Sequence, residues 1–322
     1  MNDKKLYRFL FEVSGDSRIT TKGLATALST SQQTASYTTQ KLLKDKTIQN
    51  YQTIADPAKL GLMNIIVLYH YLDFDPNRKS STRKALRDHP DVTRVEEVSQ
   101  GADLLVEYCI PNLSHFNKQH TSLIFSQKDT LSLKETYVVI VKHLYTRNYL
   151  HKRHPKIREA VICGDRDVAN MDGQQRATLD ALAKNPKAGL AAIARKLNKD
   201  PKTITKTKKW LEKKKIIRGY GAVLDHRKLD ISREHILLSL QLDDKADDAR
   251  LREHCKQDKN ITGLTKTIGP YDLIITTERL EGDPHPIDQL RRDFHVKDYR
   301  ILHSDRVDKH EYLPTTNGKE NT

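Results

Sequence analysis

The sequence predicts an α+β protein in which one two-part unit occurs twice. Three observations support this prediction. The chain repeats itself at an offset of 169 residues, each copy opens with a three-helix pattern that a strand follows, and each copy then continues as strand, helix, strand, strand, helix, strand. At 322 residues the chain is long enough for several domains.

The repeat is clearest where residues 24–60 are aligned with residues 193–229 without a gap. Twelve of these 37 positions are identical, whereas ordinary composition would give about one in sixteen by chance. The same offset places Asp103 on Asp272. We therefore expect two units, roughly 1–150 and 172–313. A polar, basic linker at 151–171 would join them, and a disordered tail at 314–322 would follow.

The first part of each unit is predicted to be a winged helix-turn-helix domain, at residues 1–55 and 172–224. In the second copy Asp172 can cap the first helix, and Asp200-Pro201 supplies a cap and a first-turn proline for the third. Ser31 occupies the place of Asp200 in the first copy. Alternating apolar residues after the third helix predict a strand or wing in both copies.

The second part of each unit has the βαββαβ order of a ferredoxin-like domain, at residues 60–150 and 230–313. The two helices of such a domain cover one face of its sheet. We expect the other face to carry Ile65, Val67, Ile236 and Leu238 and the second copy to cover it.

The charge of the chain is concentrated in one segment. Lys+Arg 56 against Asp+Glu 42 gives +14, and residues 184–218 alone carry thirteen basic and two acidic residues. Crowded lysines on the third helix of the second copy would repel each other, and a polyanion would relieve that repulsion. This favours nucleic-acid contact, with a merely solubilising lysine face as the alternative.

The third helix of the first copy is polar but hardly charged, so its amides and hydroxyls could contact base edges. The alternative is that they only solvate an exposed face. Our hypothesis is that the first copy reads sequence while the second grips phosphate. The candidate DNA-binding residues are Gln32, Gln33, Thr34, Ser36, Tyr37, Gln40 and Lys41 in the first copy, and Lys199, Lys202, Thr203, Thr205, Lys206, Lys209 and Lys213 in the second.

Several classes of protein are not expected. The opening residues lack a signal-peptide core, no apolar run is long enough to span a bilayer, and three widely spaced cysteines suit the reducing cytoplasm. No nucleophilic triad, P-loop or GxGxxG is present, so we expect no enzyme and no cofactor. His151 and His154 form only a weak metal-binding pattern, and no metal is expected.

Three stretches resemble the Lrp/AsnC (feast/famine) family of bacterial and archaeal transcription regulators: MDGQQRATLDALAKNP, LAAIARKLNKDPKTITKTKKWLEKKKIIRGYGAVLDHRKLDI and IGPYDLIITTE. Asp172 matches the family's helix-opening aspartate, whereas Lys215 stands where glycine is usual. The first copy matches more loosely, through IQNYQTIADPAKLGL and GADLLVEY.

This resemblance implies sequence-specific binding to double-stranded DNA and an amino acid or similar small molecule as effector. The family's Gly-x-Tyr-Asp loop matches Gly269, Tyr271 and Asp272, for which a tight turn between strands is the alternative. The first copy lacks the tyrosine. Because one chain holds both units, it would form an intramolecular pseudo-dimer, with further association into a homo-oligomer left open.

Two other functions remain open. Siroheme decarboxylases resemble the same family fold and use its sheet domains to hold a tetrapyrrole, with histidine and basic residues at the site. The 14 histidines of this chain show no spacing that matches such a site. An architectural protein that coats DNA through its phosphates would share every feature except the polar helix of the first copy.

Overall fold

The computed structural model describes residues 3–151, 158–241 and 245–314, and the statements below refer to these. Helices combine with strands that pair antiparallel, which confirms the α+β class. The finer division into winged helix-turn-helix and ferredoxin-like domains stays a prediction. Residues 152–157 of the predicted linker, with His154, and residues 315–322 of the predicted tail lie outside the described residues.

The first helical group is formed by α1 (Asp3–Gly15), α2 (Thr21–Leu28) and α3 (Gln32–Lys44). Ser31 caps α3, because its hydroxyl accepts a hydrogen bond from the Thr34 amide. Ala35, Thr38 and Leu42 form the buried face of α3. This three- and four-residue spacing is the apolar stripe that the sequence predicts.

The second helical group is formed by α6 (Gly173–Lys184), α7 (Leu190–Lys196) and α8 (Pro201–Lys213). Asp172 and Gln175 form a reciprocal capping box on α6. Asp200 caps α8 by accepting from the Lys202 amide at 2.7 Å. The caps that the sequence predicts therefore begin these helices in the structure.

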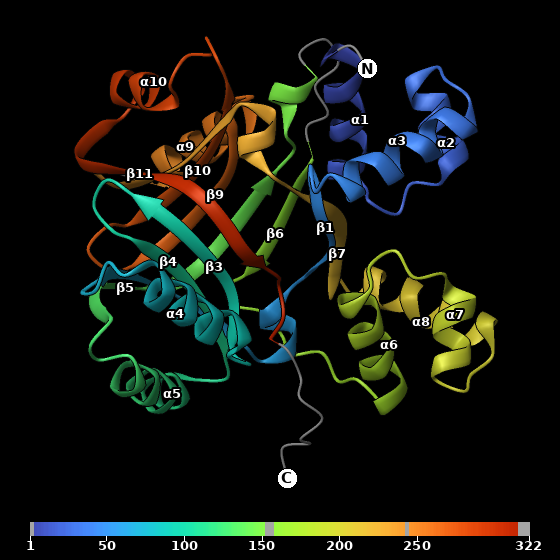
Figure 1. Ribbon diagram of the computed structural model, residues 1–322, viewed down its shortest axis with the longest axis horizontal. Coiled ribbons are helices and arrows are strands. Elements are labelled where there is room, and N and C mark those ends of the chain that lie inside the picture. Colours follow the sequence, from blue (N-terminus) through green and yellow to red (C-terminus); the bar gives the residue numbers. More distant parts are fainter. Residues whose placement is uncertain (1–2, 152–157, 242–244, 315–322) are drawn as a thin grey trace.

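A two-stranded ribbon joins the two helical groups. It is formed by β1 (Ile48–Ala55) and β7 (Ile217–Leu224), which pair antiparallel with Tyr51 opposite Ala222. Figure 1 shows this ribbon between the group of α1–α3 and the group of α6–α8. The strand predicted after each third helix thus finds its partner in the other copy.

A large sheet receives strands from both copies. The first copy supplies β2 (Met63–Tyr71), α4 (Pro76–Asp88), β3 (Val92–Ser99), β4 (Leu104–Ile110), α5 (Leu113–Ser126) and β5 (Leu131–Tyr145). The second supplies β8 (Ile231–Gln241), α9 (Lys245–Gln257), β9 (Ile261–Ile268), β10 (Leu273–Leu280), α10 (Pro286–Asp293) and β11 (His295–His310). Short 3-10 turns lie at Pro57–Leu60, Asn148–Leu150 and His226–Leu229.

The strand order closes this sheet on itself. It runs β2-β4-β3-β11-β8-β10-β9-β5, and a further pairing of β2 with β5 completes the ring. The two copies meet at β3–β11 and at β5–β9, so neither copy's strands form a separate closed layer. The short strand β6 (Glu159–Cys163) pairs with β5 outside the ring.

The predicted assignment of sheet faces is wrong by one residue. Ile65 and Val67 pack in one core with Leu86 of α4 and Leu123 of α5, so they face the helices of their own copy. Ile236 and Leu238 likewise lie under α9 and α10. Because side chains alternate along a strand, the neighbouring residues point inside the ring. The inner core contains Ile66, Leu68, Leu105, Leu237, Ile274 and Leu302.

No helix among the described residues is long and apolar enough to cross a membrane.

Candidate functional site

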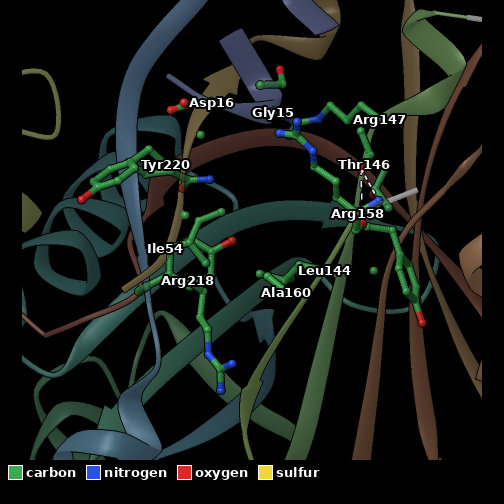
Figure 2. A pocket seen from close by; sticks show the side chains of 18 of the residues that line it. Gly15, Asp16, Ile54, Leu144, Thr146, Arg147, Arg158, Ala160, Arg218 and Tyr220 are labelled. Atoms are coloured by element: carbon green, nitrogen blue, oxygen red, sulfur yellow. Dashed lines mark hydrogen bonds between the residues drawn. The ribbon is translucent and has the colours of Figure 1, made fainter. Parts of the chain in front are cut away.

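A cavity of about 990 Å³ lies between the β1–β7 ribbon and one end of the closed sheet. Figure 2 shows Ile54, Arg218 and Tyr220 of the ribbon on one side, and Leu144 and Ala160 of β5 and β6 facing them. The end of α1 and one flank of α8 complete the wall. Both copies therefore contribute to a single cavity, whose size is typical of a ligand site.

The lining of this cavity is predominantly cationic. Among the described residues, eight basic side chains line it against four carboxylates. The basic residues are Arg18, Arg94, Lys142, Arg147, Arg158, Lys208, Arg218 and Arg233, and the acidic ones are Asp16, Glu159, Glu212 and Glu278. A cavity of this composition attracts anionic ligands.

Two buried glutamates hold the cations at the floor of the cavity. Glu278 pairs with Arg147 at 2.7 Å and accepts a hydrogen bond from Tyr149 at 2.7 Å. Glu96 pairs with Arg94 and Arg233. Burial opposes ionisation of both carboxyls, but the adjacent arginines outweigh it and hold the pKa of each well below its usual range. The floor is therefore a fixed array of ions.

This array leaves donors without partners. The buried Nε groups of Arg94 and Arg218 have no hydrogen-bond partner among the described residues. Leaving a buried donor unpaired costs about 1–3 kcal/mol, so such groups are uncommon unless a ligand or water satisfies them. Both arginines line the cavity, and the array thus suits a ligand with several acceptor groups.

His310 and Tyr312 complete the floor at the end of β11. Their ring centroids lie 5.5 Å apart, and no described residue hydrogen-bonds the His310 ring. Burial, followed by the charges of Arg94 and Arg233, holds the pKa of His310 well below its usual range. His310 is therefore a neutral imidazole in a cationic cavity, able to take up a proton once an anion enters.

A short motif containing His310 occurs twice. Lys142-His143-Leu144-Tyr145 of β5 corresponds to Lys309-His310-Glu311-Tyr312, but at an offset of 167 residues. A search at the single offset of 169 misses it, whereas a search that allows a two-residue gap finds it. The environments differ, because His143 Nδ1 lies 2.5 Å from Glu159 of β6. No β6 equivalent covers His310 in the described part of the chain.

The candidate DNA-binding residues lie on two exposed helix faces and not in the cavity. On α8 and just before it, Lys199, Lys202, Lys206, Lys209 and Lys213 are exposed, and Thr203 and Thr205 are half-buried. On α3, Gln32, Gln33, Thr34, Tyr37, Gln40 and Lys41 are exposed, and Ser36 is half-buried. The charged face of α8 is therefore open to solvent, and DNA binding there stays a prediction.

The loop with Gly269, Tyr271 and Asp272 also lies outside the cavity. The Tyr271 hydroxyl donates to Asp298 at 2.9 Å, and the Arg300 guanidinium lies 5.2 Å from the centre of the Tyr271 ring. A Cβ on Gly269 would come within 2.6 Å of the Tyr137 ring, so close packing requires glycine there. This geometry describes a tight turn, and an effector at the loop stays a prediction.

Comparison with known proteins gives a match over nearly the whole chain. No family model matches, and no curated protein matches. The solved structure of the siroheme decarboxylase NirDL in complex with an iron-uroporphyrin III analogue covers 97% of this chain and 94% of its own. It has a TM-score of 0.60 and 12% identity. A second solved structure of NirDL has a TM-score of 0.59 and 13% identity. E. coli AsnC matches 43% of this chain, with 94% of its own, a TM-score of 0.34 and 18% identity.

These matches correct one prediction. The expectation that the chain is not an enzyme is contradicted, because the whole-chain matches are to an enzyme. Motifs that are local in sequence do not reveal this cavity. The cavity is built from residues as far apart as Arg94 and His310, which only the closed sheet brings together. Lrp/AsnC regulators match parts of the chain, which leaves membership of that family unconfirmed.

Proposed function

We propose that the cavity binds a tetrapyrrole with several carboxylate groups and that the protein removes CO2 from it. The observation that carries this proposal is a cationic cavity lined by His310 and by Arg94 and Arg218, whose Nε groups have no hydrogen-bond partner among the described residues. The likeness to siroheme decarboxylase NirDL supports it at the level of the fold. A porphyrin with peripheral carboxylates presents acceptors on all sides, as the arginines on opposite walls require.

The reaction needs carboxylate binding and one proton. Loss of CO2 from a carboxylate leaves an electron pair on carbon, and protonation of that carbon replaces the lost group. The arginines bind and orient the carboxylates. A bound carboxylate neutralises the charge of the arginines and thereby raises the proton affinity of His310. His310 can then deliver the proton to the carbon and take up another proton from water.

Binding and turnover of iron-uroporphyrin III and siroheme test this proposal. We expect an absorbance change on binding and a mass loss of one CO2 per step. His310→Asn should retain binding but lose about 10²- to 10⁴-fold in rate. Arg158→Gln removes an exposed cation from the wall and should weaken binding, whereas Arg78→Gln on α4 serves as a matched control. Absence of binding, or full activity of His310→Asn, would contradict the proposal.

A second candidate function is binding of double-stranded DNA by a pseudo-dimeric regulator. It is favoured by one observation, the exposed lysine stripe on α8 together with an exposed polar face on α3 of the other copy. Lysines on one stripe release counterions from phosphates, while the glutamines of α3 can pair with bases. An architectural role would need only the lysines.

The salt dependence of DNA affinity tests this second function. Each phosphate contact contributes about −0.9 to the slope of log K against log salt. Neutralising Lys202, Lys206 and Lys209 to Gln should flatten the slope, and Gln33→Ala should leave it unchanged while lowering the preference for a selected site. Equal affinity for selected and random DNA would contradict sequence-specific regulation and favour the architectural role.

A further inference from the structure

Helix α8 presents three different faces. Ile204, Thr207 and Leu211 are buried against the second helical group. The exposed stripe is on the opposite side and consists of Lys202, Lys206, Lys209 and Lys213. Lys208 and Glu212 lie on a flank that lines the cavity. At 3.6 residues per turn, this flank is roughly a third of a turn from the exposed stripe.

The contacts on this flank connect α8 to the cavity. Lys208 Nζ lies 2.5 Å from Glu212 Oε1, and the Tyr220 hydroxyl donates to the same oxygen at 3.1 Å. The Lys208 ammonium and the Arg18 guanidinium each lie 5.3 Å from the centre of the Tyr220 ring. A ligand carboxylate that reaches Lys208 must therefore compete with Glu212.

We propose that a polycarboxylate in the cavity and duplex DNA on the exposed stripe of α8 weaken each other's binding. This rests on both functions proposed above and adds their coupling. A carboxylate on Lys208 neutralises a charge beside Lys209 and releases the negative charge of Glu212. The helix is about 10 Å wide, and the Debye length at 0.1 M salt is also about 10 Å, so the two anions repel each other across it.

The coupling is confined to the second copy. At the offset of 169 residues, Thr39 and Leu43 of α3 correspond to Lys208 and Glu212. The Thr39 hydroxyl donates to the Ala35 carbonyl at 2.8 Å, and Leu43 carries no charge. No described residue of α3 lines the cavity. Ligand in the cavity therefore acts on the lysine stripe and not on the polar face of α3.

The test uses the full chain, a fluorescently labelled duplex and iron-uroporphyrin III as the cavity probe, at low salt. Saturating probe should weaken DNA affinity at least about five-fold, the lower end of typical coupling between sites. Saturating DNA should weaken probe affinity by the same factor, because coupling is reciprocal. Lys208→Gln should reduce that factor, and Thr39→Ala, the matched change in α3, should not.

The outcomes separate coupling from the two functions. Probe and duplex are first titrated separately, and failure of either to bind would overturn the corresponding function together with the coupling. If both bind and neither alters the other, the coupling alone is overturned. Replacing Lys202, Lys206 and Lys209 by Gln should weaken DNA binding only. Equal weakening of the probe would show that the probe occupies the lysine stripe, which also overturns coupling through the cavity.

Discussion

His143 and His310 show how environment decides what one residue type can do. Both stand second in a Lys-His-x-Tyr motif at the end of a long strand. His143 is held by Glu159 of β6, whereas His310 has no hydrogen-bond partner among the described residues and lies between arginines. The motif was available in the sequence, but the difference between its two copies depends on the linker strand, which no local pattern assigns to β5.

We expect His310 to make the protein less stable in mild acid. Its pKa in the folded chain is lowered, so below about pH 6.5, the ordinary pKa of histidine, the unfolded chain binds more protons than the folded chain. The contribution of neutral His310 to the free energy of unfolding is complete above pH 6.5 and is lost as the pH falls below that value. Between pH 7 and pH 5 the free energy of unfolding should fall by about 1–2 kcal/mol more in the wild type than in His310→Asn.

Urea denaturation at several pH values measures this difference, with His295→Asn as a control at an exposed histidine. If the free energy of unfolding fell by the same amount in the wild type and in His310→Asn, the lowered pKa of His310 would be contradicted.

At the scale of elements, the start of a helix can be predicted from the residues next to it, whereas the pairing of strands cannot. Asp172, Asp200 and Ser31 begin α6, α8 and α3 as their residue types predict. The alternating pattern of β1 and β7 equally predicts a strand after each third helix. It cannot show that the two strands pair with each other, because alternation fixes which face is buried and leaves the partner undetermined.

The cap of α8 provides a prediction about one element. Asp200→Ala removes the acceptor for the Lys202 amide, so we expect a loss of about 1 kcal/mol in the free energy of unfolding. Asp200→Asn should restore most of it, since asparagine is an equally good cap. Ser31→Ala in α3 is the matched change in the first copy. A stability of Asp200→Ala equal to that of the wild type in urea denaturation would show that another group satisfies the amide.

At the scale of the whole molecule, the ring of strands makes the two copies interdependent. Strand β11 pairs with β8 of its own copy and with β3 of the other, and Leu302 lies fully buried in the core shared by both. The sequence correctly predicts two copies of one strand–helix order. It does not predict a shared interior, and the error of one residue in assigning Ile65 and Ile236 arose there, because both faces of these strands are apolar.

We therefore expect the molecule to unfold as one unit. Leu302→Ala should lower the free energy of unfolding by about 2–5 kcal/mol. The fluorescence of Trp210, the single tryptophan, reports on α8, and circular dichroism reports on the whole chain. The two transitions should shift together, whereas a tryptophan transition that stays in place would show that the second helical group unfolds independently.

The covalent joining of the two copies has an evolutionary consequence. In a homodimer every substitution appears on both sides of the symmetry axis, so a change that improves one half-site alters the other as well. Here each position mutates once. A strand such as β6 can be added beside one copy alone, and one histidine can gain a carboxylate partner that its counterpart does not share. Because both copies lie in one chain, each copy can acquire substitutions that the other lacks, which the identical subunits of a homodimer cannot do.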